Sequence, residues 1–573
     1  MTATAKDGGE AVLEAIRRLG VEYVVTSPGS EWSPFWEAMS RQRIEGRNGP
    51  QFIQCWHETL ALSIATGYTT VTGRMQAVLL HAGAGMMHGA MSLAGATRGE
   101  VPMVVLSGES VSLGEDPDRP MEPQWYAGVS VGGADRLVSP MAKWSGRVHS
   151  AVTLYQSVVR AGEMAQRAPK GPVHVDIPME YMLEGWTPPE TLRDVPDAPL
   201  QVAPSQDIER LAAALVAAKN PMIVAEQAGQ DPDAYAALVR LAEVAAVPVA
   251  GVAGANFAVF PYDNPLWIGF DAGRYLRDAD LVLLVGGRTP WSPPSKPVTS
   301  GRIVALGEQP IKDWLVYQNL QADEYVEGNL AHSLEALMKA LEAIGVDRDA
   351  ADARRAKWTT VHQEMDAKLR AERDAASQRE TLSVPAIAEV MAAVMPADTI
   401  YVDETITHSA GLRQHLPLNR AQSFFRHNGG GLGQGLGLSL GIKLAARERP
   451  VVLFVGDGSL LYNPIIQAFG ASKHYDLPVI VVVMNNQSYA SMRRGHRRYY
   501  PEGATSNTNT DFGYGVSIEA PAFDELGQPF GFFGAKAATP GEFRAALKDA
   551  LASTKDGRTA IINAAVPVPA PAG

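Results

Sequence analysis

Cysteine is almost absent from this sequence, which contains one such residue, Cys55, and therefore forms no internal disulfide. Long hydrophobic runs are also absent: no stretch approaches bilayer length, and the start MTATAKDGGEAV lacks the apolar segment of a signal peptide. Basic residues are the minority, with 50 Lys and Arg against 62 Asp and Glu and a net charge of -12. Because that charge opposes general binding to nucleic acids or acidic membranes, we expect the protein to bind neither. The single cysteine and the lack of apolar targeting segments lead us to expect a cytoplasmic location.

Length and composition predict a globular chain of several domains. A chain of 573 residues exceeds what one hydrophobic core usually supports, and we expect three domains. Hydrophobic residues make up 46% and charged residues 20%, which excludes the fibrous and disordered classes. The 54 glycines suit an α/β enzyme with many tight turns.

Strand-length apolar segments alternate with helix-length segments between residues 8 and 341. This alternation predicts two doubly wound domains, and a strand-helix-strand pattern at 450–489 adds a third. The expected fold is therefore α/β with three doubly wound domains, each a parallel sheet with helices on both faces. The predicted ranges are 1–190 for an N-terminal domain, 200–345 for a central domain, 346–380 for a charged helical linker and 381–573 for a C-terminal domain. The expected strands are 22–27, 51–56, 75–81 and 101–109 in the first domain and 219–227, 242–251, 279–287 and 302–308 in the second.

The segment 450–489 carries the clearest chemical signal. It reads PVVLFVGDGSLLYNPIIQAFGASKHYDLPVIVVVMNNQSY: an apolar strand, a Gly-Asp-Gly turn, a helix-length stretch and a second apolar strand. A right-handed crossover makes the two strands parallel, so Asp457 and Asn486 should open into one crevice at the carboxyl ends of these strands. A carboxylate, an amide oxygen and a nearby backbone carbonyl are ligands that a hard cation such as Mg²⁺ prefers.

The residues around this turn also favour binding of a phosphate group. Gly456 and Gly458 allow the backbone to approach a phosphate closely. Ser459 lies at the amino end of the next helix, where unpaired amide groups attract anions. Gly-Asp-Gly is also a common turn sequence, so the alternative is a turn without a ligand.

The asparagine pair at the end of the next strand favours the ligand interpretation. Gly-Asp-Gly followed, after a helix-length spacer and a strand, by Asn-Asn resembles the signature of thiamine-diphosphate enzymes. The resemblance implies that Asp457, Asn486 and the main-chain carbonyl of Ser488 hold Mg²⁺ against the diphosphate of the cofactor.

A glutamate in the N-terminal domain supplies a second element. In CWHETLALSIATGYTTVTGR, Glu58 opens a helix directly after a strand, and the alternative role is an acidic residue placed favourably at a helix amino terminus. The segment resembles the catalytic-glutamate helix of the thiamine-diphosphate decarboxylase and acetohydroxyacid synthase superfamily. The matching residues are His57, Glu58, Gly67, Tyr68, Thr72 and Gly73. The resemblance implies that Glu58 hydrogen-bonds N1′ of the aminopyrimidine and favours its imino tautomer, which removes the C2 proton and generates the ylide nucleophile.

Further candidates surround this helix in the sequence. VVTSPGSEWSPFW resembles the Pro-Gly-Ser loop of benzoylformate decarboxylase and implies that Ser30 lies beside the substrate; a type I or II turn at Pro28 is the alternative. His81 and His88 in LLHAGAGMMHG are groups able to relay protons, or else core histidines bonded to backbone carbonyls. EPQWYAG resembles a segment of the synthase branch of this superfamily, and the resemblance implies that Gln124 is an active-site glutamine.

The C-terminal domain contains a glycine-rich segment, HNGGGLGQGLG, in which no window satisfies Gly-x-Gly-x-x-Gly. This failure disfavours a nicotinamide dehydrogenase. The segment resembles the family's glycine loop before a helix, which implies that Gly430 offers a carbonyl to the pyrimidine amino group and that Leu432 bends the cofactor. Upstream, Glu404 and Thr405 follow a strand and could approach the diphosphate.

Together these resemblances imply an enzyme that uses thiamine diphosphate and Mg²⁺ to cleave or form a carbon-carbon bond adjacent to a carbonyl. The expected class is a 2-oxo acid decarboxylase or carboligase similar to acetolactate synthase, acting on a 2-oxo acid or 2-hydroxy ketone. The alternatives are a 2-hydroxyacyl-CoA lyase-type enzyme and a non-catalytic thiamine-diphosphate-binding homologue. The family implies a homodimer or homotetramer with the cofactor at the subunit interface. Some members bind FAD or an ADP-containing group in the central domain, and the sequence does not decide this point.

Two features bear on the substrate. The central segment LLVGGRTPWSPPSKP has Trp291 and no histidine where benzoylformate decarboxylase has an active-site histidine, so the substrate class stays open. The segment SMRRGHRRYYP, directly beyond Ser488, surrounds His496 with arginines at 493, 494, 497 and 498. The first interpretation of this segment is a basic patch that attracts a substrate with an extra anionic group, and the second is a solvated helix face.

Overall fold

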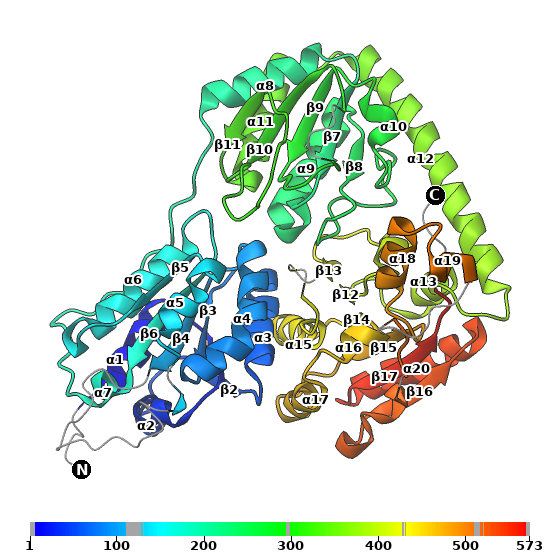
Figure 1. Cartoon of the computed structure of the whole chain (residues 1–573). Coiled ribbons are helices and arrows are strands. Elements are labelled where there is room, and N and C mark those ends of the chain that lie inside the picture. Colours follow the sequence, from blue (N-terminus) through cyan, green and yellow to red (C-terminus); the bar gives the residue numbers. More distant parts are fainter. Residues whose placement is uncertain are drawn as a thin grey trace. The chain divides into compact units, whose positions relative to one another are not determined.

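The computed structural model contains three β-sheets with helices packed around them (Figure 1). It describes residues 6–109, 128–129, 131–293, 298–426, 429, 431–508, 516–519 and 521–568. Within the described residues, all strand pairings in these sheets are parallel. The prediction of three parallel-sheet α/β domains is confirmed.

The first sheet has six strands in the order β2-β1-β3-β4-β6-β5. These strands are β1 (Tyr23–Ser27), β2 (Gln51–Gln54), β3 (Gln76–Leu80), β4 (Met103–Glu109), β5 (Trp144–Arg147) and β6 (Pro172–Pro178). The helices around it are α1 (Gly8–Arg18), α2 (Ser33–Ile44), α3 (Glu58–Thr72), α4 (Ala82–Arg98), α5 (Ala134–Val138), α6 (Leu154–Gln166) and α7 (Met179–Leu183). Strands β3 and β6 are buried along their whole length, as expected where helices cover both faces of a parallel sheet.

The central sheet has five strands in the order β11-β10-β9-β7-β8. These strands are β7 (Pro221–Ala225), β8 (Val249–Gly251), β9 (Leu281–Val285), β10 (Arg302–Gly307) and β11 (Glu324–Glu327). Its helices are α8 (Ser205–Ala217), α9 (Pro232–Ala245), α10 (Gly273–Leu276) and α11 (Leu330–Ile344).

The third sheet has six strands in the order β13-β12-β14-β15-β17-β16. These strands are β12 (Ile400–Glu404), β13 (Phe424–Arg426), β14 (Val451–Gly456), β15 (Ile480–Asn485), β16 (Phe533–Ala537) and β17 (Ala560–Ala565). The same C-terminal stretch of the sequence forms the helices α13 (Val384–Val394), α14 (Ser409–His415), α15 (Gly435–Ala445), α16 (Asp457–Leu460), α17 (Ile465–His474), α18 (Ala490–Tyr499), α19 (Ala504–Thr508) and α20 (Pro540–Lys555).

The predicted charged helix is the single long helix α12, which runs for 30 residues from Arg348 to Ser377. Asp347 caps it by accepting a hydrogen bond from the backbone amide of Ala350. Among the described residues no helix is both long and apolar enough to cross a membrane.

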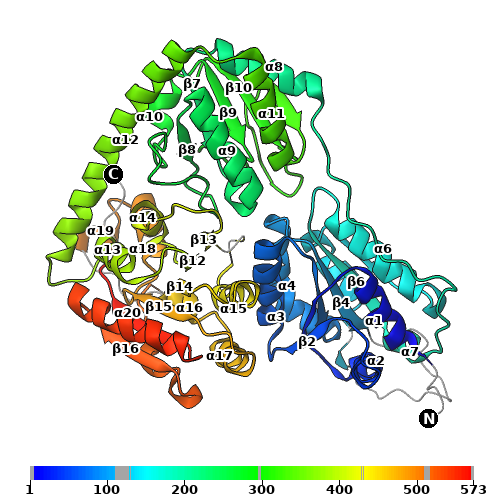
Figure 2. The same ribbon diagram turned by 180° about the vertical axis from the view of Figure 1, so that it is seen from behind.

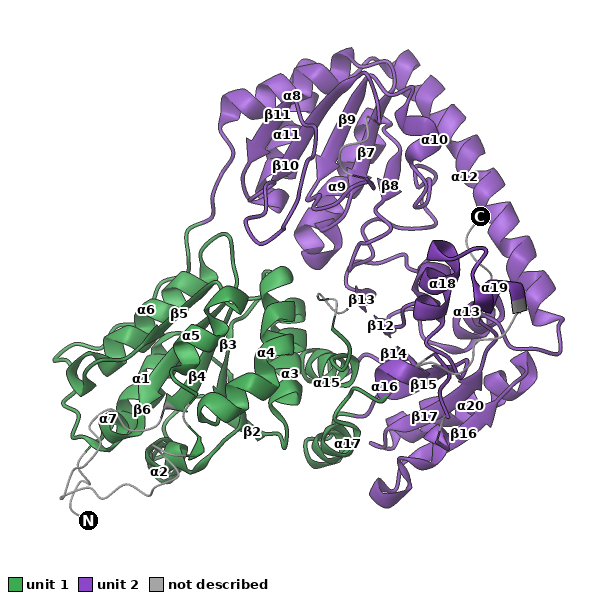
Figure 3. Cartoon of the chain, in the orientation of Figure 1, with its two compact units in different colours: residues 1–199, 427–447, 461–477 green, residues 200–426, 448–460, 478–573 purple. Residues whose placement is uncertain are grey.

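The chain divides into two compact units that do not follow the order of the sequence (Figure 3). Unit 1 comprises residues 1–199, 427–447 and 461–477, and unit 2 comprises residues 200–426, 448–460 and 478–573. Helices α15 and α17 therefore belong with the first sheet, although their sequence lies between strands of the third. Seen from either side, α15 runs beside α3 (Figures 1 and 2).

The structure of unit 1 explains the two glycines, Gly67 and Gly73, of the segment that contains Glu58. Helix α3 ends at Thr72, and Gly73 adopts the left-handed conformation with φ of 70° that commonly terminates a helix. A Cβ on Gly67 would lie 2.3 Å from the carbonyl oxygen of Leu438 in α15. A glycine at position 67 therefore allows the backbones of α3 and α15 to touch.

One expected strand is partly wrong. Residues 242–245 form the last turn of α9, and only residues 249–251 form β8. The stretch AEVA favours a helix, which ends where Ala246 adopts a left-handed conformation with φ of 50°. The expected strands also omit β5, β6 and β11; in β6 the buried polar residues His174 and Asp176 interrupt the apolar pattern that marks a strand.

Candidate active site

Asp457 and Asn486 lie next to each other in unit 2, as the strand order predicts. Strands β14 and β15 are parallel neighbours with Gly456 opposite Met484, so both residues follow at the same edge of the sheet. The Asp457 carboxylate is buried and accepts hydrogen bonds from the amide of Gly458 at 2.8 Å and the amide of Asn486 at 3.0 Å.

Asp457, Asn486 and Ser488 carry the oxygen atoms predicted to bind a hard cation. Burial raises the pKa of Asp457 above its ordinary value, while backbone amides, including those of Gly458 and Asn486, partly offset the increase. The Asn486 side-chain oxygen accepts the amide of Ser488 at 3.0 Å. Ser488 faces Ser517 in an isolated antiparallel bridge whose hydrogen bonds come from neighbouring residues, so the Ser488 carbonyl points away from that strand. Hydrogen bonds thus link Asp457 to Asn486 and Asn486 to Ser488, and a carboxylate, an amide oxygen and a backbone carbonyl are the types of ligand that Mg²⁺ prefers.

The glycines of the turn differ in their structural roles. A Cβ on Gly458 would lie 2.4 Å from the ring of Tyr489, so only glycine fits at this position without displacing the tyrosine. A Cβ on Gly456 would make ordinary contacts with Ser459, the nearest being 3.4 Å. Ser459 itself is buried in α16.

The end of β12 lies in the same unit and is deeply buried. Glu404 and Thr405 have no exposed surface. The Thr405 hydroxyl donates to Asp403 at 2.6 Å, and the Thr405 amide donates to the same oxygen at 2.8 Å, so this side chain stabilises the turn. Burial lowers the pKa of the nearby His408, and the charge of Arg494 in α18 adds to the decrease. The basic helix therefore comes close to this edge of the sheet.

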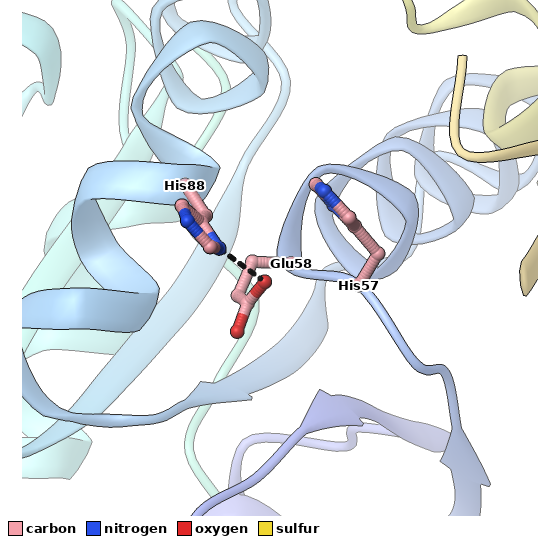
Figure 4. Close-up of side chains that lie close together, drawn as sticks. All are labelled: His57, Glu58 and His88. Atoms are coloured by element: carbon pink, nitrogen blue, oxygen red, sulfur yellow. Dashed lines mark hydrogen bonds and ion pairs between the residues drawn. The ribbon is translucent and has the colours of Figure 1, made fainter.

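Glu58 is the first residue of α3 in unit 1. His57 caps the helix: its backbone is extended, and its Nδ1 accepts the amide hydrogen of Thr59 at 3.2 Å. The Glu58 side chain is 13% exposed, and His88 Nδ1 lies 3.3 Å from Glu58 Oε2 (Figure 4). A Cβ on Gly85 would lie at an ordinary contact distance of 3.4 Å from Glu58 Cγ, so α4 packs beside the glutamate at this residue.

His81 is held by a residue that the sequence interpretation missed, Glu31. Its Nδ1 lies 3.0 and 2.9 Å from the two oxygens of Glu31, which is fully buried and also accepts the amide of Ala82 at 3.2 Å. The hydrogen bond with Glu31 raises the pKa of His81, with the charges of Glu31 and Glu58 adding to the increase and burial opposing it. In SPGSEWSPFW the glutamate stands beside Trp32, but nothing in that segment identifies His81 as its partner. Both His81 and His88 contact carboxylates, so neither is a core histidine bonded only to backbone carbonyls.

The remaining predicted residues are placed only in part. Ser30 is exposed and begins a short 3₁₀ helix, and its carbonyl accepts the Ser33 hydroxyl at 2.6 Å. Gly29 is extended, with φ of -105° and ψ of 178°, which excludes a type I or II turn centred on Pro28 and Gly29. Leu432 is half-buried in the loop before α15. Gln124 and Gly430 lie outside the described residues.

The central sheet carries a cavity of about 920 Å³ beside the carboxyl ends of β8 and β9. Trp291, the residue found in place of a histidine, lines it. Other lining residues are Gly251, Phe270, Arg274, Arg277 and Thr289.

Three family models match parts of the chain that contain strands of the three sheets. Residues 6–124 match the thiamine pyrophosphate enzyme N-terminal TPP binding domain, residues 208–337 match the central domain of the same enzymes, and residues 406–564 match their C-terminal TPP binding domain.

Similar proteins cover nearly the whole length. The chain is 24% identical over 560 residues to the acetolactate synthase large subunit of Haemophilus influenzae, covering 95% of this chain and 92% of that protein. It is 25% identical over 571 residues to benzoylformate decarboxylase of Pseudomonas aeruginosa, covering 95% and 96%. Its fold is similar to that of a thiamine diphosphate-dependent 4-hydroxybenzoylformate decarboxylase of Rhodococcus jostii RHA1, with a TM-score of 0.79, 24% identity and 98% and 99% coverage. The chain therefore belongs to the thiamine pyrophosphate enzyme family.

Proposed function

We propose that this chain uses thiamine diphosphate and Mg²⁺ to cleave or form the carbon-carbon bond next to the carbonyl of a 2-oxo acid or 2-hydroxy ketone. The observation that carries the proposal is Glu58, a largely buried carboxylate that begins α3 and lies close to His57 and His88. Its segment resembles the catalytic-glutamate helix of this family. The names of the relatives, acetolactate synthase and benzoylformate decarboxylase, support a reaction at a 2-oxo acid.

In this proposal the residues at the edge of the third sheet bind the charged end of the cofactor. Asp457, the Asn486 side-chain oxygen and the Ser488 carbonyl would hold Mg²⁺, which in turn offsets the diphosphate charge. The burial of Asp457 supports this role. Burial raises the pKa of its carboxyl group, and a bound cation would stabilise the ionised form. Glu404 and Thr405 would border the same position.

In this proposal Glu58 and the residues around it hold and transfer protons. Bound thiamine diphosphate supplies the electron sink for the bond that breaks at the carbonyl carbon. Glu58 would hold a proton at N1′ of the aminopyrimidine. Glu31 holds His81 through Nδ1, and we assign His81 a role in proton transfer at the substrate, for which Ser30 is the second candidate residue.

Helix α18 supports a substrate with an anionic group beyond the reacting carbonyl. The helix starts two residues after Ser488 and carries arginines 493, 494, 497 and 498 around His496. Arginine binds carboxylates in a two-pronged geometry, and a basic patch attracts anions toward a site. We also propose a homodimer or homotetramer, in which the N-terminal domain of one chain pairs with the C-terminal domain of its partner.

Two substitutions test the proposal. Glu58→Gln should keep thiamine diphosphate and Mg²⁺ binding, measured by calorimetry, but slow exchange of the C2 proton in D₂O by about 10² to 10⁴. Asp457→Ala should weaken cofactor binding sharply, because the diphosphate charge loses its compensation. Glu37→Gln is the matched control for Glu58→Gln, since the Glu37 side chain is 60% exposed on α2 of unit 1, which also contains Glu58.

The exchange rate is read by acid quench followed by NMR of the released cofactor. An unchanged rate in Glu58→Gln would remove this residue from the mechanism and overturn the proposal. A panel of 2-oxo acids, tested with and without aldehyde acceptors, then separates decarboxylation from ligation.

A further inference from the structure

His57, Glu58 and His88 form a compact group in unit 1, with one ligand-type atom of each lying within 4.8 Å of the others (Figure 4). Two imidazoles and a carboxylate can bind either a transition-metal ion or a proton. The geometry of the two rings distinguishes these uses.

The rings are not arranged to share a metal ion. Their planes are 13° from parallel and their centroids lie 5.6 Å apart, so the rings stack. The nitrogen lone pairs lie in the ring planes, and lone pairs in two stacked parallel planes do not converge on one ion. In addition, His57 Nδ1 already accepts the amide hydrogen of Thr59, which caps α3.

The same arrangement suits proton transfer between Glu58 and solvent. The Glu58 side chain is 13% exposed, whereas the His88 side chain is 66% exposed, and they meet at 3.3 Å through Nδ1 and Oε2. Helix α4 passes beside the glutamate at Gly85 and Gly89, where an added Cβ would lie 3.4 Å from Glu58 Cγ and 3.7 Å from Glu58 Cβ, both ordinary contact distances. His88 lies on the same helix, and its ring stacks with that of His57.

We propose that His88 carries protons between solvent and Glu58. The proposal rests on the role of Glu58 given above. In one direction, protonated His88 gives its Nδ1 proton to Glu58 Oε2, which leaves a neutral imidazole and a carboxylic acid; a hydronium ion or buffer acid then reprotonates the exposed ring. In the other direction each step reverses, and the proton ends on water or buffer base.

The charged and titratable groups around this path come from two helices and the loop before α2. They are His57 and Glu58 at the start of α3, His81 before α4, and Glu31, whose charge acts on His81. Burial lowers the pKa of His57, which is consistent with its neutral ring accepting the cap hydrogen bond. In the single chain His88 is the most exposed member of this group, and we therefore assign it the exchange of protons with water.

The test measures C2 proton exchange of bound thiamine diphosphate in two variants. His88→Asn removes the ring, and His88→Phe keeps an aromatic ring against His57 but transfers no proton. Both should slow exchange by about 10²-fold, and added imidazole buffer should restore most of the rate by replacing the lost side chain. His149→Asn is the control, because His149 is an exposed histidine of the same unit.

The possible outcomes separate this proposal from the wider one. Unchanged exchange in both variants, or slow exchange in the Asn variant alone, would overturn the relay and leave the proposed function in place. Slow exchange without imidazole rescue would also overturn it, in favour of a structural role. Glu58→Gln, which imidazole should not rescue, tests the proposed function itself.

A second measurement uses the protein without cofactor. Calorimetry with ZnCl₂ should show no tight binding that depends on His88. Tight binding of Zn²⁺ that disappears in His88→Asn would make the group a metal site and overturn the relay.

Discussion

The contact between α3 and α15 predicts that two helical glycines cannot become alanines. A Cβ on Gly67 would lie 2.3 Å from the Leu438 carbonyl oxygen, and a Cβ on Gly441 would lie 2.0 Å from the Ile64 carbonyl oxygen. Both obstacles are backbone atoms in the interior of a helix, so no side-chain rotation relieves the overlap. Because α3 carries Glu58, this contact also supports the candidate site.

The expected loss of stability follows from the movement that alanine would require. Contacts of this kind are ordinary at 3.4–4 Å, so the helices must separate by about 1 Å at each substituted position. Forcing extra atoms into a packed interface costs about 1–3 kcal/mol, of which alanine recovers up to about 1 kcal/mol through its better helix propensity. The upper part of that range applies, because the obstacle is backbone, and we expect a net loss of about 2 kcal/mol for each variant.

Thermal and urea unfolding, followed by circular dichroism, measure this loss. The matched control is Gly495→Ala in the interior of α18, where a Cβ would meet nothing within 4 Å. That substitution should stabilise its helix by up to about 1 kcal/mol, the opposite sign. If Gly441→Ala proved as stable as the parent, or gained stability like the control, the close approach of α3 and α15 would be refuted.

Two further predictions concern pH and charge. His174 is fully buried with its ring nitrogens 2.8 Å from the hydroxyls of Ser107 and Ser145, and burial lowers its pKa to about 3. The unfolded imidazole titrates near 6.5, so the unfolded state binds more protons than the folded state below that pH. The free energy of unfolding should therefore fall between about pH 6.5 and 3 by up to about 1.4 kcal/mol per pH unit. If urea unfolding showed the same loss of free energy between pH 7 and pH 5 for the parent and for His174→Gln, this prediction would be contradicted. Replacing Arg493 and Arg494 together by alanine should raise KM for an anionic substrate and reduce the salt dependence of KM, while calorimetry shows unchanged cofactor binding. Unchanged kinetics in this double variant at low ionic strength would indicate that α18 is a solvated basic face.

The amino-acid sequence alone determined the structural features that depend on residues close together in the chain. The apolar runs before Asp457 and Asn486 predict two parallel strands, and the observed neighbours β14 and β15 bring these residues within hydrogen-bonding distance. Likewise, His57 and Glu58 after a short strand predict the start of α3, because a cap acts on backbone amides in the first turn. Short-range backbone geometry is enough to explain both.

Tertiary packing alone decided the features that join distant segments. The pairing of Glu31 with His81 joins residues 50 positions apart, and no local pattern selects that partner from the other carboxylates. The helical start of 242–251 also escaped prediction, because alanine-rich stretches suit a buried helix and a buried strand until their neighbours are known. For the same reason Gly67 could be recognised as part of a motif, but its purpose became visible only when the backbone of α15, far along the chain, packed against it.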